Sequence, residues 1–121
     1  MARWSIADAP DQQGRTALVT GATSGLGLET ARALASRGAR VLVAGRDAAR
    51  TDAAVGEVTA AAADGGSGEP VQLDLARLVG IAAAADDVRS RVDALDVLVN
   101  NAGVMAPPFG RTADGFETQI G

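Results

Sequence analysis

The residues best suited to chemistry in this chain are three glycines between a strand-like and a helix-like segment. Gly21, Gly25 and Gly27 stand in the run TGATSGLG, directly after the β-prone residues TALV. In such a unit the first glycine permits a tight turn, the next lets backbone approach a pyrophosphate, and the last lets helix and strand pack closely. The N-terminus of the following helix offers free N–H donors and a partial positive charge. The turn therefore predicts a site for the phosphates of a dinucleotide.

The same turn has a plainer interpretation and excludes one other kind of phosphate site. A strand-to-helix turn can need glycine only because its backbone requires a positive φ angle. Thr23 and Ser24 place two hydroxyl donors beside the glycines, which favours the phosphate site. No Gly-Lys-Ser or Gly-Lys-Thr follows, so the loop that holds nucleoside triphosphates is absent.

Several residue types that carry chemistry are missing. The chain has no cysteine and no histidine, which excludes disulfides, thiolate catalysis, a serine–histidine–acid triad and the commonest metal ligand. Tyrosine is also absent, and all eleven basic residues are arginine, so there is no lysine. The net charge is −4, which makes nucleic acid a poor partner because its phosphates demand clustered positive charge.

Four β-prone runs alternate with three helical patterns along the 121 residues. The β-prone runs are TALVT at 16–20, RVLVAG at 40–45, VQL at 71–73 and DVLVNNAG at 96–103, which includes the exit from its strand. The helical patterns run from Gly25 to a stop at Gly38, from about Ala48 to Ala63, and from a cap at Asp74 through Leu95, and another helix is expected to begin near 112. Strands alternating with helices imply parallel strands joined by right-handed crossovers. We therefore predict an α/β fold with a doubly wound parallel sheet.

The ends of the chain give the predicted domain organisation. Residues 1–15 form a polar lead-in with Pro10 and Gly14 as breakers, and residues 16–121 form one domain. The lead-in lacks the apolar core of a signal peptide, and the longest apolar runs are too short to span a bilayer. We expect a cytoplasmic protein without a membrane span.

The spacing of the glycine turn resembles a known family. The pattern T-G-x-x-x-G-x-G, combined with NNAG at the exit of the fourth strand, resembles the short-chain dehydrogenase/reductase family. The stretches WSIADAPDQQGRTALVTGATSGLG, AGRD and TADGFETQIG resemble its retinol-dehydrogenase-like branch. The resemblance covers essentially the whole chain but only the N-terminal half of a family member. It implies a truncated Rossmann-type fold that binds a nicotinamide dinucleotide.

The resemblance also implies which residues line the cofactor. The phosphates would lie against Gly21, Thr23, Ser24, Gly25, Leu26 and Gly27. Asp74 and Leu75 would border the adenine, unless Asp74 is only a helix cap and Leu75 only a core residue. The ribose and nicotinamide end would pass beside Asn100, Asn101, Ala102 and Gly103. Either asparagine could instead tie the sheet together, because a carboxamide both donates and accepts hydrogen bonds.

Cofactor choice depends on the end of the second strand. An acid there accepts hydrogen bonds from the ribose 2′-OH of NAD, whereas a basic residue pairs with the 2′-phosphate of NADP. The strand ends at Gly45, where the family's NAD-preferring members usually place their acid, and Arg46 follows with a planar fork that matches phosphate. Asp47 is an alternative ribose acid, which we interpret as a helix cap. NADP(H) is therefore favoured, with NAD(H) as the alternative.

The catalytic groups that the resemblance implies are not in this chain. Family members use a tyrosine as acid/base, a lysine four residues later, a serine and a relay asparagine to move a hydride between nicotinamide and a carbonyl or alcohol. A tyrosine with an ordinary pKa of about 10 needs a neighbouring cation to work near neutrality. Because both tyrosine and lysine are missing, we expect an inactive N-terminal part of an oxidoreductase, whose small-molecule substrate is bound only by the intact protein.

Two other interpretations remain open from the sequence. The chain could be a catalytically inactive dinucleotide-binding or interaction module that is complete at 121 residues, although its fourth strand would then leave an open sheet edge. A flavin- or nucleotide-sugar-binding protein fits the fold but matches the paired motifs less well. Substrate and oligomeric state cannot be assigned from these residues.

Overall fold

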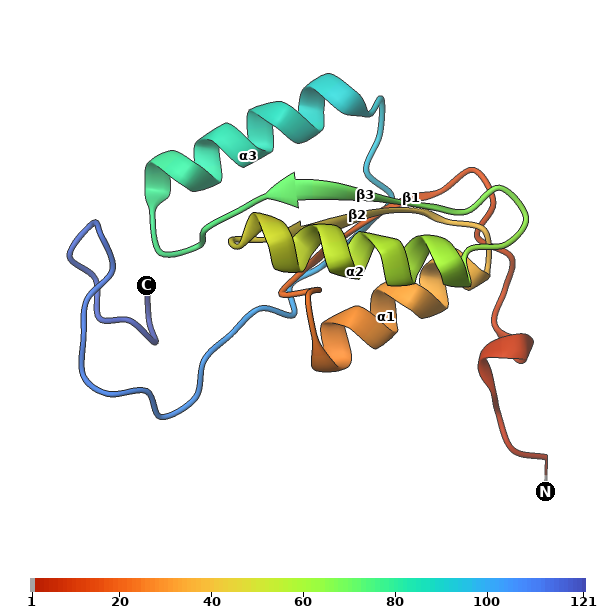
Figure 1. Cartoon of the computed structure of the whole chain (residues 1–121), viewed down its shortest axis with the longest axis horizontal. Coiled ribbons are helices and arrows are strands. Elements are labelled where there is room, and N and C mark those ends of the chain that lie inside the picture. The colour runs from red at the N-terminus through yellow and green to blue at the C-terminus, as the bar shows by residue number, and fades with distance from the viewer. Residues whose placement is uncertain (1) are drawn as a thin grey trace.

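The computed structural model describes residues 2–121 and contains one parallel sheet between helices (Figure 1). The strands are β1 (Thr16–Thr20), β2 (Arg40–Gly45), β3 (Ser67–Gln72) and β4 (Val97–Val99). The helices are α1 (Gly25–Ser36), α2 (Ala48–Ala61) and α3 (Leu78–Arg91), preceded by a short 3₁₀ helix, η1 (Ile6–Asp8). The strand order is β3-β2-β1-β4 and every pairing is parallel. The predicted Rossmann-type doubly wound sheet is confirmed.

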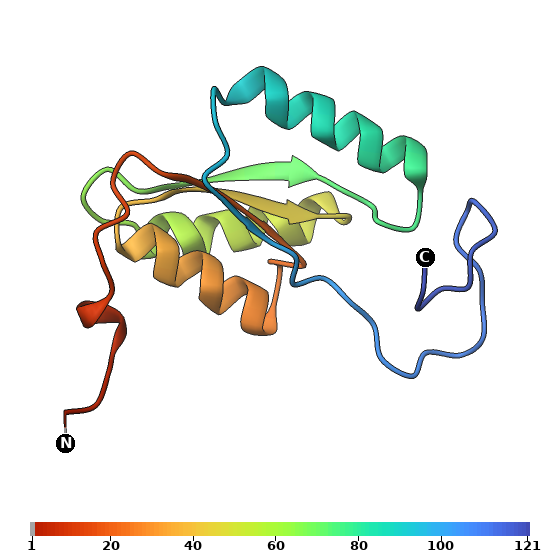
Figure 2. The ribbon, with the colours of Figure 1, turned by 180° about the vertical axis from the view of Figure 1, so that it is seen from behind.

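The helices cover both faces of the sheet. Figures 1 and 2 show α1 and α2 together against one face and α3 against the other. The chain passes from β1 outward to β2 and β3, and then returns to place β4 on the other side of β1. The strand order therefore reverses between β1 and β4, and open α/β sheets bind ligands at such a point, beyond the carboxyl ends of the strands.

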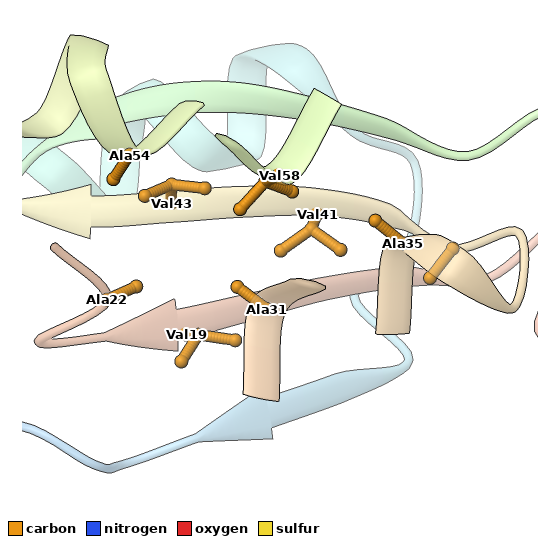
Figure 3. Close-up of a cluster of buried hydrophobic side chains, with 9 residues drawn as sticks. Val19, Ala22, Ala31, Ala35, Val41, Val43, Ala54 and Val58 are labelled. Atoms are coloured by element: carbon orange, nitrogen blue, oxygen red, sulfur yellow. The ribbon is translucent and has the colours of Figure 1, made fainter. Parts of the chain in front are cut away.

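The core between the sheet and the first two helices is built from small aliphatic side chains (Figure 3). Val19, Val41 and Val43 are fully buried on the strands, and alanines face them from α1 and α2. Alanine lets each helix approach the sheet closely, so the valines fill the remaining space. A second cluster joins the other sheet face to Ala84 and Val88 of α3. Four successive buried positions in both β1 and β2 reflect this packing on two faces.

The third strand begins earlier than the sequence predicts. It starts at Ser67, which pairs with Arg40, four residues before the VQL run at 71–73 that the sequence predicts as strand. Pro70 lies inside it because β3 is an edge strand, where a missing N–H donor is tolerated.

The third helix also differs from its predicted bounds. It ends at Arg91, so Leu95 at the end of the predicted apolar stripe lies outside it. Asp74 is not its cap: the Asp74 carboxylate accepts a hydrogen bond from Ala76 N–H at 2.9 Å, within the preceding loop. The carboxylate at the helix start comes instead from Asp114, which accepts from Leu78 N–H at 2.7 Å.

The segment that contains Asp114 is not the helix that we expected near residue 112. It consists of turns and one antiparallel bridge between Arg111 and Glu117. Ala113 N–H donates to Ala76 O at 3.0 Å, a second contact that holds this segment beside the start of α3. Within residues 2–121, no helix is both long enough and apolar enough to cross a membrane.

Candidate functional site

A cleft of about 650 Å³ lies at the carboxyl ends of the strands. Its volume falls in the range of roughly 300–1,000 Å³ that is usual for ligand sites. Its walls come from the glycine turn, the ends of β2 and β3, the exit of β4 and the C-terminal segment, towards which the strand arrows point in Figure 1. The lining residues are Thr20, Gly21, Thr23, Ser24, Ala44, Gly45, Arg46, Arg50, Leu73, Asp74, Leu75, Ala76, Asn101, Ala102, Gly103, Val104, Arg111, Thr112, Thr118, Gln119 and Gly121.

The three glycines of the turn serve different steric needs. Gly21 and Gly25 have positive φ angles of 62° and 57°, which side chains rarely adopt. A Cβ on Gly21 would lie 2.9 Å from Ala102 Cα, and a Cβ on Gly27 would lie 2.3 Å from Gly21 O. A Cβ on Gly25 would meet nothing within 4 Å. Gly21 and Gly27 are therefore fixed by packing, whereas Gly25 leaves open space in which a ligand can approach the backbone.

The first turn of α1 presents unpaired donors beside that space. The first helical hydrogen bond runs from Leu28 N–H to Ser24 O at 3.3 Å, so the N–H groups of residues 25–27 precede the helical ladder. Ser24 occupies the N-cap position, but its side chain makes no capping hydrogen bond. Its hydroxyl is therefore free to contact a ligand. Leu26 is 81% exposed at the same helix end.

Thr20 and Asn101 tie the glycine turn to the exit of β4. The Thr20 hydroxyl accepts hydrogen bonds from Asn101 N–H at 3.1 Å and Ala102 N–H at 3.0 Å. The Asn101 carboxamide donates to Thr20 O at 3.1 Å and to Gly21 O at 3.3 Å. Asn101 thus has the structural role that the sequence left open as an alternative. Asn100 is exposed and outside the cleft lining.

Two arginines flank the cleft where β2 passes into α2. Arg46 follows the strand and Arg50 lies four residues later, in the first turn of the helix. Asp47 caps α2 by accepting from Arg50 N–H at 2.9 Å, as predicted, and is not among the lining residues. The ion pairs found within residues 2–121 all involve other arginines. The guanidinium groups of Arg46 and Arg50 are therefore available to an anion.

Asp74 and Leu75 form the adjoining wall after β3. Both line the cleft, and Leu75 is 42% exposed, so its plainer interpretation as a core residue is wrong. The C-terminal segment contributes Arg111, Thr112 and Thr118 to the lining, which the sequence analysis did not identify. Nothing in their types or spacing marks them, because turns of the folded chain bring them to the cleft.

The side chains whose pKa values are shifted lie outside the cleft lining. Hydrogen bonds from Arg40 lower the pKa of Glu69, and those same bonds raise the pKa of Arg40. A hydrogen bond to Asp87 raises the pKa of Arg91. Arg40 begins β2, whereas the cleft lies at the other end of that strand. These ion pairs therefore stabilise the fold and take no part in the cleft. No group of three or more potential metal-binding side chains occurs within residues 2–121.

Known proteins resemble this chain in sequence. The family model for short chain dehydrogenase matches residues 15–118. Retinol dehydrogenase 12 of Homo sapiens is 43% identical over 110 residues, which cover 89% of this chain and 34% of that protein. Retinol dehydrogenase 11 of Mus musculus is 48% identical over 109 residues, with 89% and 34% covered. The chain thus spans about a third of the length of these relatives.

Solved structures agree with the sequence comparison. A crystal structure of a protein from Mycobacterium paratuberculosis superposes with a TM-score of 0.83 at 46% identity, covering 97% of this chain and 40% of that one. A metagenomic short-chain oxidoreductase in complex with NADP gives 0.70 at 44% identity, covering 77% and 41%. With its parallel sheet, its glycine turn and a family match that extends over nearly every element, the chain belongs to the short-chain dehydrogenase family, and its relatives include retinol dehydrogenases.

Proposed function

We propose that this chain forms the dinucleotide-binding part of an oxidoreductase that transfers a hydride between NADP(H) and a carbonyl or alcohol substrate. One observation carries the proposal: the glycine turn, with its open Gly25 and unpaired N–H groups, opens into a cleft at the point where the strand order reverses. Such a turn, placed there in a member of this family, has the donors and the space that a pyrophosphate needs.

The residues around the cleft fit the parts of NADP(H). The helix N-terminus and the Ser24 hydroxyl suit the pyrophosphate, which accepts hydrogen bonds. Arg46 and Arg50 supply two unpaired guanidinium groups for a 2′-phosphate. Leu75 offers an exposed apolar surface for the adenine beside Asp74. The metagenomic relative was crystallised in complex with NADP, which supports the same choice.

When bound, NADP(H) supplies or accepts the hydride, and the residues of this chain hold and orient it. No tyrosine or lysine is present to move the accompanying proton. Since the curated relatives are about three times as long as the matched segment, we assign the acid/base group and the substrate pocket to residues beyond these 121. The names of several relatives favour an alcohol such as retinol as a model substrate for the intact protein.

The preference for NADP(H) is tested by reversing the charge of Arg46. The Arg46→Asp variant should bind NADPH about 10- to 100-fold more weakly, because a hydrogen bond to a charged group is worth about 1.5–3 kcal/mol. NADH, which has no 2′-phosphate, should lose little affinity. Calorimetric titration of both cofactors measures the ratio.

Arg3→Asp provides the matched control. It makes the same charge change on an exposed residue in the lead-in, outside the cleft lining. An unchanged ratio of the NADPH and NADH dissociation constants in Arg46→Asp would refute the proposed preference. An equal shift in Arg3→Asp would trace the effect to net charge alone.

A further inference from the structure

The end of β2 has no room for a side chain at residue 45. A Cβ on Gly45 would lie 2.5 Å from Thr51 Oγ1 and 2.7 Å from Thr23 Cγ2, closer than Cβ atoms approach other atoms. Gly45 is not among the residues with positive φ, so its backbone conformation does not demand glycine. Two threonines from different elements, one in the glycine turn and one in α2, therefore keep this position free of a side chain.

Thr51 is held firmly in place. It is a buried polar residue with 3% exposure, and its hydroxyl donates to Asp47 O at 2.7 Å. Rotation about χ1 would break that bond, and a β-branched side chain has few other rotamers in a helix. Thr23 is half-buried and has the same branched shape. An added side chain at residue 45 would thus have to displace a buried, hydrogen-bonded hydroxyl.

Resting on the proposed function, we propose that Thr51 and Thr23 determine cofactor specificity because together they leave no room for an acidic side chain at residue 45. The end of the second strand is where an acid would accept hydrogen bonds from the ribose of NAD. Here that acid is excluded by packing, and the space beside it is bordered by Arg46 and Arg50. Thr51 does not line the cleft, so it is a positioning residue that acts through residue 45.

The test introduces a side chain at residue 45 in two backgrounds of the full 121-residue chain. Gly45→Asp is made alone and in a Thr23→Ser/Thr51→Ala background, which removes the two atoms nearest to the added Cβ. Gly45→Ala is made in both backgrounds as a milder variant that folds if the aspartate does not. Gly56→Asp is the matched control, because a Cβ there meets nothing within 4 Å. Thermal unfolding without cofactor and the dissociation constants of NADPH and NADH are measured for each.

We expect Gly45→Asp alone to lower Tm by about 5 °C or more and to weaken both cofactors, because overpacking a filled site distorts its surroundings. In the shortened background the same change should lower Tm by less than about 2 °C. It should also shift the NADPH-to-NADH affinity ratio towards NADH by about tenfold or more. Gly56→Asp should leave the ratio of the wild-type chain unchanged.

Several results would overturn the proposal. An equal fall in Tm in both backgrounds would mean that Thr23 and Thr51 are not what excludes a side chain at residue 45. If the Gly45→Asp chain is as stable as wild type and prefers NADH, the wild-type structure already has space for an acidic side chain at residue 45. A stable aspartate variant with an unchanged cofactor ratio would remove the specificity role. A wild-type chain that binds neither cofactor would refute the proposed function itself, a failure distinguishable because the unfolding measurements need no cofactor.

Discussion

The Thr20 hydroxyl connects the glycine turn to the exit of β4, the two segments that it aligns in the candidate site. It accepts two backbone N–H groups from the exit of β4 and donates to Val99 O at 3.4 Å. Thr20 itself is 5% exposed, so water cannot replace these partners freely. One side chain in β1 therefore sets where the backbone of residues 101–103 lies relative to the glycine turn.

Replacing Thr20 by valine should destabilise the chain and weaken cofactor binding together. The valine keeps the shape but leaves Ala102 N–H without an acceptor, which costs about 1–3 kcal/mol, whereas Asn101 N–H still donates to Val99 O at 3.0 Å. Urea unfolding and NADPH titration measure the two effects. Thr16→Val is a control at the opposite end of the same strand, where the threonine side chain has no hydrogen bond to the described residues. Equal stability of Thr20→Val and wild type would contradict the assigned role.

The role of a residue can be predicted from the sequence when it depends on near neighbours, but not when it depends on contacts with distant residues. The positive φ angles of Gly21 and Gly25 and the helix cap at Asp47 agree with the sequence-based expectation, because these features depend on neighbours within a few positions. Thr20 was missed because its partners lie about 80 residues away. Arg50 was missed because only the first turn of α2 places it at the same cleft as Arg46.

At the scale of elements, an ion pair joins the edge strand β3 to its neighbour β2. Arg40 of β2 binds Glu69 of β3 through both its Nε and its Nη2, the latter at 2.9 Å. Arg40 Nη1 also donates to Arg91 O at the end of α3. Both side chains of the pair are about a third exposed, so solvent screens their attraction.

The pair predicts how stability changes with pH. Because Arg40 lowers the pKa of Glu69, the pair stabilises the fold above the ordinary glutamate pKa of about 4.3, and this stability is lost as pH falls through the lowered value. Glu69→Gln should therefore cost about 0.5–1 kcal/mol at pH 7 and almost nothing at acid pH. Urea unfolding across this range measures the difference.

A more exposed ion pair supplies the control for Glu69→Gln. Glu29 and Arg32 lie three residues apart on α1 with 67% and 43% of their side chains exposed. Glu29→Gln should change the free energy of unfolding by only a few tenths of a kcal/mol. A pH-independent cost for Glu69→Gln would show that lost packing, and not charge, explains it.

The boundaries of elements were predictable only where local signals decide them. Gly38 ends α1 with a positive φ of 97°, and Asp47 begins α2, as the sequence predicts. The start of β3 depends instead on pairing with β2, which admits Gly68 and Pro70 to the strand. The carboxylate at the start of α3 comes from Asp114, 36 residues further along the chain, so no local pattern could reveal it.

At the scale of the whole molecule, the chain contains a candidate binding cleft but not the catalytic residue types that the resemblance implies. The cleft is built from described residues, whereas the sequence contains no tyrosine and no lysine, the two residues that the family resemblance implies for catalysis. Among the described strands β4 pairs with β1 only, and Leu98 on it is 54% exposed. The sequence predicted this edge from the order of its elements, but which side of β1 the strand joins required the structure.

The 121-residue chain should bind NADPH without oxidising it in the presence of carbonyl compounds. Incubation with NADPH and retinal, followed by absorbance at the nicotinamide band, measures turnover. We expect a rate equal to that of NADPH alone, because the tyrosine and lysine that the resemblance implies for proton transfer are absent from this chain. Turnover above that background would show that residues of this chain do perform the acid/base step.

The most direct measurement is a calorimetric titration of the wild-type chain and of Gly21→Val with NADPH. We predict saturable binding at one site in the wild type and none in Gly21→Val, because a branched side chain there meets Ala102 and cannot adopt the positive φ. Gly65→Val, which imposes the same backbone strain at an open position with φ of 89°, should retain binding. Equal binding by wild type and Gly21→Val would contradict a cofactor site at the glycine turn.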